Sequence, residues 1–228
     1  MNTQYVLNDT ENIYSPALVF FKDLIRRNLE VALAIAKKPE RMRPHVKTHK
    51  TREIVRIELD AGITKHKCAT LAEAEMLAGC GVKDVLLAYP LVGPNCQRMA
   101  KLVRAYPDCR FLVTADDLGA AQELSHALQV AEVTVEVLLD IDPGQHRTGV
   151  APGPAAATLY DQISRLPGLK PGGLHVYDGH QHQEDPAERE KAVLGQLVPV
   201  LNLQKSLERA KISVPRLVLG GTPTFPIY

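Results

Sequence analysis

The stretch Val135-Glu136-Val137-Leu138-Leu139 is a nearly continuous apolar run of β-branched and aliphatic residues. Such a run is typical of a parallel strand whose two faces are covered by helices. Further β-prone runs alternate with amphipathic segments on both sides of it. The strands expected along the chain are residues 17–20, 43–47, 65–68, 85–89, 110–114, 133–140, 173–177 and 216–219.

Amphipathic helices are expected over residues 23–37, 71–78, 117–128 and 188–211. Eight strands with helices between them predict an α/β fold, a (β/α)8 barrel, as one domain over residues 1–228. A doubly wound open sheet is the alternative, although no GxGxxG motif follows the first expected strand. Because the sequence stops at Tyr228, directly after the last expected strand, we expect a barrel that is cut short at its C-terminal end.

The composition argues against several classes of partner. Lys and Arg number 27 and Asp and Glu 26, which gives a net charge of +1. This balance predicts neither nucleic-acid binding nor attraction to an anionic membrane. No apolar run approaches the roughly 20 residues of a membrane-spanning helix. Cys68, Cys80, Cys96 and Cys109 form no CxxC pair, so we expect reduced thiols and a cytoplasmic location.

In a parallel barrel, reactive groups lie where the strands end. Lys47 is the last residue of the second expected strand and lies within Arg43-Pro44-His45-Val46-Lys47-Thr48-His49-Lys50. Burial lowers the pKa of a lysine and makes its amine a nucleophile towards carbonyl groups. The alternative is an ordinary lysine at the solvent-exposed rim.

The triplet Gly220-Gly221-Thr222 follows the last expected strand. Two glycines allow the backbone to approach an anion, and the N–H groups with one hydroxyl can hold a phosphate. An ordinary turn is the alternative. Together with Lys47, the triplet predicts a phosphorylated aldehyde cofactor.

Other polar residues also follow expected strands. Arg147 lies in the glycine-bounded loop 142–149 and can hold a phenolate or a carboxylate, or remain solvated. Tyr177 can stack on a planar ring or fill the mouth of the barrel. His180 and His182 can chelate a metal or form a solvated pair.

Two more predictions concern the residues that flank Lys47 and the expected helix over residues 71–78. If the strand runs on, His45 and His49 share a face with Lys47 and can tune it. Glu73 and Glu75 are expected on the solvated face of the helix over residues 71–78.

The motif from Arg43 to Lys50 resembles the cofactor-lysine motif of D-threonine aldolases and eukaryotic-type D-serine dehydratases, which are fold-type III pyridoxal-phosphate enzymes. These enzymes are related to the N-terminal barrel of alanine racemase. Three further stretches match in the same order: residues 67–75, 142–149 and 220–224. The resemblance covers essentially the whole chain.

The resemblance implies roles for individual residues. Lys47 would bond covalently to pyridoxal 5'-phosphate and act as the base at the substrate α-carbon. Arg147 would lie near the phenolic oxygen of the cofactor, and Tyr177 where alanine racemase has a ring-packing histidine. Gly220, Gly221 and Thr222 would bind the phosphate. His180 or His182 would handle the proton of the β-hydroxyl group.

The resemblance also implies an activity, a lyase acting on small D-β-hydroxy amino acids. The shared motifs leave two outcomes open, aldol cleavage to glycine and an aldehyde, or dehydration. A single-domain pyridoxal-phosphate-binding protein without turnover and an amino-acid racemase are the alternatives. Family members carry their divalent-metal ligands, for zinc or manganese, in a C-terminal β-domain that this sequence lacks. No metal ligand is therefore assigned here, and a homodimer is compatible with the family.

Overall fold

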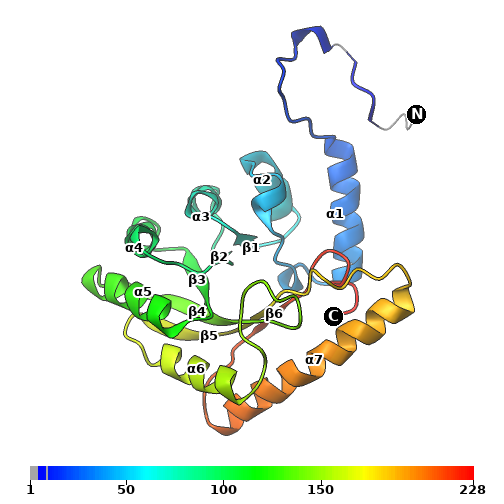
Figure 1. The fold of residues 1–228 in the computed structure, drawn as a ribbon. Helices are drawn as coiled ribbons and strands as arrows, with labels where there is room; N and C mark the ends of the chain where they lie inside the picture. The colour runs from blue at the N-terminus through cyan, green and yellow to red at the C-terminus, as the bar shows by residue number, and fades with distance from the viewer. Residues whose placement is uncertain (1–4, 9) are drawn as a thin grey trace.

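The computed structural model describes residues 5–8 and 10–228. Within them, strands and helices alternate from β1 to β6 (Figure 1). The strands are β1 Lys65–Cys68, β2 Asp84–Leu87, β3 Arg110–Ala115, β4 Val135–Ile141, β5 Leu169–Val176 and β6 Leu217–Leu219. The α-helices are α1 Lys22–Ala36, α2 Arg52–Asp60, α3 Leu71–Gly79, α4 Pro94–Ala105, α5 Leu118–Val130, α6 Pro154–Ser164 and α7 Pro186–Arg209. The 3-10 helices are η2 Thr10–Asn12, η3 Pro39–Arg41 and η4 Val46–Thr48.

The strands form one parallel sheet in the order β1-β2-β3-β4-β5-β6. Each strand pairs with the next one in the chain, as in a barrel, whereas a doubly wound sheet reverses its strand order. The α/β fold of parallel-barrel type is therefore confirmed, and the doubly wound alternative is wrong. Among the described residues the sheet stays open, with β1 and β6 at its two edges, so it forms a half-barrel.

Two of the expected strands are wrong as regular strands. Residues 17–20 belong to no helix or strand and leave Leu18 70% exposed, because this segment precedes α1 and pairs with no part of the described sheet. The expected strand over residues 43–47 is reduced to a single bridge between His45 and Lys67. Pro44 has no N–H to donate to a ladder, and the chain turns into η4 directly after His45.

The expected helices over residues 23–37, 71–78, 117–128 and 188–211 correspond to α1, α3, α5 and α7. Side chains cap three of them. The Thr70 hydroxyl accepts the N–H of Glu73 at 3.1 Å, and Asp117 accepts the N–H of Ala120 at 2.8 Å. Asp185 precedes Pro186 at the start of α7 and accepts the N–H of Ala187. Each cap satisfies a backbone donor that a helix leaves unpaired, which explains where these helices begin.

The two faces of the sheet differ because side chains alternate along each strand. Val85 and Val113 belong to the large core between the sheet and the helices. Leu86, Leu112 and Leu138 form a second, small apolar cluster on the opposite, concave face. This face lines the interior of the half-barrel, where the alternation also places the polar residues of the strands.

Ion pairs link β2 and β4 to arginines from other parts of the chain at the amino end of the concave face. Asp84 on β2 accepts hydrogen bonds from Arg43, at 2.6 Å, and from Arg110 on β3. Glu136 on β4 accepts a hydrogen bond from Arg216, which precedes β6. The interior of the half-barrel is therefore charged at the amino ends of the strands, apolar in the middle, and polar again at their carboxyl ends.

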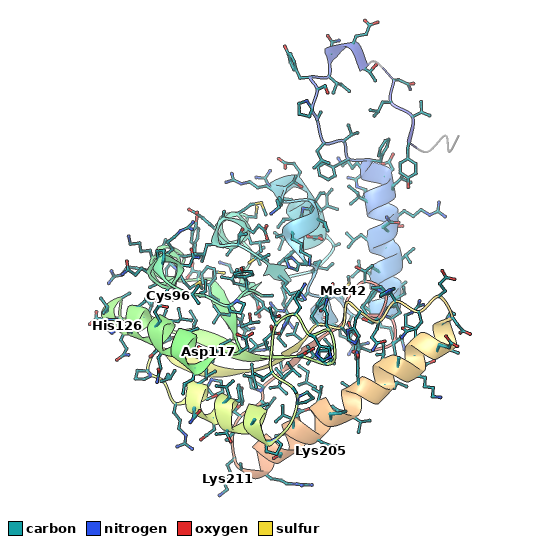
Figure 2. The ribbon with its side chains drawn as sticks, in the orientation of Figure 1. Met42, Cys96, Asp117, His126, Lys205 and Lys211 are labelled. Carbon is teal, nitrogen blue, oxygen red and sulfur yellow. The ribbon has the colours of Figure 1, made fainter. Side chains whose placement is uncertain are left out.

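Helix α1 rises away from the sheet at its upper end, and the chain terminus at Tyr228 lies beside its lower end (Figure 1). The guanidinium of Arg41, just after α1, donates to the Tyr228 carbonyl at 2.8 Å. Figure 2 shows Met42 in the same region, distant from Lys211 beyond the far end of α7. None of the helices in the described chain is both long and apolar enough to cross a membrane.

Candidate functional site

Three cationic side chains from different parts of the chain converge on the ring of Tyr177, the residue that follows β5. Lys47 Nζ in η4 lies 5.5 Å from the ring centroid, and Lys67 Nζ on β1 lies 5.6 Å from it. Arg147 Cζ, in the loop after β4, lies 5.0 Å from the same point. Such contacts are favourable, because the face of an aromatic ring is electron-rich. The arrangement concentrates positive charge at the carboxyl end of the half-barrel.

Glycines allow two loops to approach the Tyr177 ring closely. A Cβ added to Gly221 would lie 3.3 Å from Tyr177 Cε2, and one added to Gly179 would lie 2.5 Å from the hydroxyl of Tyr177. The triplet Gly220-Gly221-Thr222 therefore lies against the ring that Lys47 and Arg147 approach. Its expected proximity to these residues is observed.

Asp178 holds the loop after β6 in place. It is fully buried and accepts hydrogen bonds from Thr224 Oγ1 at 2.8 Å, Tyr228 Oη at 2.8 Å and Gln196 Nε2 at 3.1 Å. Thr224 Oγ1 in turn accepts the N–H of Gly221 at 2.8 Å. Burial and the neighbouring Asp178 carboxylate raise the pKa of Tyr228. Asp178 directly follows Tyr177, but no sequence pattern indicates its role, because its partners Gln196, Thr224 and Tyr228 are distant in the chain.

The loop that carries Arg147 is shaped by Asp142. This carboxylate accepts the N–H of Gly144 at 2.8 Å and the N–H of His146 at 3.0 Å. Gly149 closes the loop with φ of +89°, and a Cβ there would lie 2.8 Å from the backbone nitrogen of Asp142. Only glycine fits such a position, so the loop is built to hold Arg147 at the mouth of the half-barrel.

His45 lies beside Lys47 as a neutral hydrogen-bond acceptor. Its Nδ1 accepts the N–H of Lys47 at 3.2 Å. Burial, and after it the nearby ammonium groups of Lys67 and Lys47, lower the pKa of His45 to about 3. The prediction that His49 shares this face is wrong, because η4 turns the chain after His45, and His49 Nδ1 instead accepts the N–H of Thr51.

Lys67 is the most buried cation of the group, with an exposed fraction of 8%. Burial is the main cause that lowers the pKa of Lys67 to about 8, and the charges of Lys47 and Arg43 add to it. By contrast, Lys47 is exposed, as the alternative of an ordinary lysine at the solvent-exposed rim predicts. No sequence pattern singled out Lys67, because its closeness to Tyr177 depends on the curvature of the whole sheet, which brings β1 and the end of β5 to one interior.

A buried pair, Asp140 and His175, lies on the same concave face. His175 Nδ1 is 2.7 Å from Asp140 Oδ1. Because a carboxylate only accepts, Nδ1 carries the proton, and burial lowers the pKa of His175 against the opposing effect of Asp140. His175 Nε2 is buried without a hydrogen-bond partner. The sequence feature that could have identified His175 is its position on β5, two residues before Tyr177, which places both side chains on the same face.

The other predicted residues lie at different places. A Cβ on Gly144 would lie 3.4 Å from His180 Nε2, so His180 packs on the loop that carries Arg147. His182 is exposed and does not share that contact. Glu75 is exposed as expected, but the prediction of a solvated Glu73 is wrong. Glu73 is 4% exposed and accepts hydrogen bonds from the backbone N–H of Ala69 and from the ammonium group of Lys50.

A cavity of about 1050 Å³ runs along the concave face. Lys47, Lys67 and Tyr177 line one part of it, with Gly220, Gly221 and Thr222. Asp84 and Arg110 line the part towards the amino ends of the strands. No group of three or more His, Cys, Asp or Glu side chains in the described residues is arranged to hold a metal ion.

The chain is similar to enzymes that are about twice its length. It is 28% identical to a D-threonine aldolase of Arthrobacter over 91% of this chain and 55% of the aldolase. It is also 28% identical to a D-threo-3-hydroxyaspartate dehydratase of Delftia, over 92% of this chain and 56% of the dehydratase. The crystal structure of D-threonine aldolase from Filomicrobium marinum matches with a TM-score of 0.86 and 31% identity, over 94% of this chain and 58% of that one.

The family model described as "Alanine racemase, N-terminal domain" matches residues 22–227, which includes every strand of the sheet and every residue that approaches Tyr177. This chain therefore belongs to the alanine racemase N-terminal domain family.

Proposed function

We propose that this protein binds pyridoxal 5'-phosphate through Lys47 and acts as a lyase on D-amino acids with a β-hydroxyl group. The supporting observation is that an amine and a glycine loop meet at one aromatic ring. Lys47 Nζ is 5.5 Å from the centroid of Tyr177, and a Cβ on Gly221 would be 3.3 Å from the ring edge. A phosphorylated aldehyde needs both an amine and an anion-binding loop.

The residues present fit this cofactor. Lys47 would hold its aldehyde carbon and Gly220 to Thr222 its phosphate, in a cavity of about 1050 Å³ that these residues line. Arg147, whose Cζ lies 5.0 Å from the centroid of the Tyr177 ring, would hold its phenolic oxygen. When bound, the cofactor supplies an electrophilic carbon and a ring that withdraws electrons from the substrate α-carbon. The cationic surroundings favour a ligand with several negative charges.

The side chains of this chain supply proton transfer and orientation. Lys47 would act as the base at the substrate α-carbon. His180, which packs on the Arg147 loop, would take the proton of the β-hydroxyl group. The exposed His182 is the second candidate for that proton.

Two outcomes fit a β-hydroxy substrate, cleavage of the Cα–Cβ bond or loss of water. The aldolase and the dehydratase reported above are each 28% identical to this chain, so identity does not favour either. We place aldol cleavage first and dehydration second. The alanine racemase of Clostridium difficile, at 15% identity and a TM-score of 0.71, shares the fold and supports no racemase activity here.

The test of cofactor binding is the visible absorption spectrum of the purified protein with added pyridoxal 5'-phosphate, before and after borohydride. We expect an absorption band that borohydride converts into a stable covalent adduct on Lys47. Lys47→Ala should abolish both signals. The matched control is Lys50→Ala, which removes another exposed lysine of the same motif, one that bonds Glu73. An unchanged adduct in Lys47→Ala would refute the assignment.

The test of the reaction is the identity of the products formed from D-threonine and D-serine. Glycine and an aldehyde indicate aldol cleavage, whereas a 2-oxo acid and ammonia indicate dehydration. Each assay is run with and without added Zn²⁺ or Mn²⁺. The assays use unreduced protein loaded with pyridoxal 5'-phosphate. If such a protein binds the cofactor through Lys47 but forms neither set of products, with or without metal, it would be a pyridoxal-phosphate-binding protein.

A further inference from the structure

Lys67 is a buried cation that points into the cavity. It lies on the concave face of β1, is 8% exposed and has its Nζ 5.6 Å from the centroid of Tyr177. Burying an ammonium group costs free energy unless a nearby anion compensates its charge. The question is therefore which anion does so.

The part of the chain that the structure describes supplies no direct counter-ion to Lys67. Within residues 5–8 and 10–228, its Nζ forms neither an ion pair nor a hydrogen bond. Other lysines of this region are paired: Lys50 with Glu73, and Lys65 with the carbonyl of Glu40 at 2.9 Å.

The two buried carboxylates that act on Lys67 through space are already engaged. Asp140 bonds His175 at 2.7 Å. Asp178 accepts three hydrogen bonds, from Thr224, Tyr228 and Gln196. In the described residues neither carboxylate forms an ion pair or a hydrogen bond with Lys67 Nζ, so both act on it only at longer range and Lys67 has no direct anionic partner there.

We propose that Lys67 is an oxyanion-binding residue of the site, whose partner arrives with the ligand. This inference rests on the proposed function, which already assigns Lys47, Arg147 and the glycine loop to other parts of the cofactor. The oxyanion is either the carboxylate of the amino-acid substrate or an oxygen of the cofactor. Both are anionic and both enter the cavity that Lys67 lines.

The test compares Lys67→Met with the wild type and with Lys65→Met. Lys65 is a matched control, because it lies two residues earlier on the same face of β1 and already has a partner. Methionine keeps the unbranched shape of lysine without its charge. Circular dichroism and the melting temperature establish that each variant is folded.

The first arm measures the affinity of the metal-free, cofactor-free protein for pyridoxal 5'-phosphate by absorption titration. The second arm titrates the loaded protein with D-threonine and with D-threoninol, which lacks the carboxylate. A hydrogen bond between charged groups predicts that Lys67→Met weakens binding about tenfold or more in one arm. Weaker cofactor binding identifies a cofactor oxygen; weaker binding of D-threonine but not of D-threoninol identifies the carboxylate.

If Lys67→Met and Lys65→Met differ by no more than about twofold in affinity in both arms, the proposal is overturned. A hydrogen-bonded ion pair contributes more to affinity than a twofold change. If the wild type binds no pyridoxal 5'-phosphate, the proposed function fails, and inorganic phosphate then tests Lys67 alone. We expect millimolar phosphate to raise the melting temperature of the wild type and of Lys65→Met, and to raise that of Lys67→Met less. An equal rise in all three proteins, or none in any, would also overturn the proposal.

Discussion

Asp178→Ala is expected to destabilise the protein and to loosen the loop at residues 220–224. The carboxylate is 0% exposed and accepts hydrogen bonds from Thr224, Tyr228 and Gln196, at 2.8, 2.8 and 3.1 Å. Each hydrogen bond to a charged group contributes about 1.5–3 kcal/mol, and bonds that share one acceptor are not additive. We therefore expect a loss of about 3–5 kcal/mol in the free energy of unfolding.

For a chain of this length, such a loss lowers the melting temperature by about 10 °C. The free energy is measured by urea denaturation and the melting temperature by circular dichroism. Because Thr224 connects Asp178 to the N–H of Gly221, we also expect weaker binding of pyridoxal 5'-phosphate. Asp178→Asn keeps one acceptor oxygen and should lie between the wild type and Asp178→Ala.

Asp161→Ala is the control, because it removes a carboxylate that pairs with Arg165 on the surface of α6. Such a solvent-exposed pair contributes little to stability. If Asp178→Ala were no less stable than Asp161→Ala, the hydrogen-bond network would not be what holds the loop.

Three further perturbations test other parts of the site. Lys67 has a pKa of about 8 when folded against an ordinary value of 10.5, so between these values the unfolded chain binds more protons and stability rises with pH. Measured by urea denaturation, the free energy of unfolding is expected to rise by about 2 kcal/mol between about pH 7.5 and 9.5. Lys65→Met should show the same rise as the wild type, and Lys67→Met should lack it. Gly179→Ala forces the Tyr177 ring to move and should cost about 1–3 kcal/mol, whereas Gly195→Ala in α7 meets no atom within 4 Å and should not destabilise. Burial alone would raise the pKa of Asp84, but Arg43 and Arg110 outweigh it and lower that pKa. The stabilisation from Asp84 is therefore full above its unfolded pKa of about 4 and is lost below it, and Asp84→Asn should reduce this acid sensitivity of the denaturation midpoint.

The fold was largely predictable because its signals are local. The apolar run at 135–139 and the helix that begins after Thr70 depend on periodicity and capping, which involve residues a few positions apart. The two wrong strand predictions concern segments in which strand formation depends on pairing with a distant strand. Residues 17–20 have β-prone side chains but no partner strand, and residues 43–47 meet β1 at one bridge only.

The sequence by itself predicted that Lys47, Arg147, Tyr177 and the triplet at 220–222 are neighbours, because each lies at or just after the end of an expected strand, and the structure brings them together although residues 43–47 form no strand. Only the tertiary structure decided what surrounds them. Lys67 approaches Tyr177 because β1 and β5 curve around one interior, and Asp140 bonds His175 across adjacent strands 35 residues apart. Glu73 is buried because Lys50 and the N–H of Ala69 face it. Burial and charge compensation depend on neighbours that are distant in the chain, and helical or strand periodicity does not encode those neighbours.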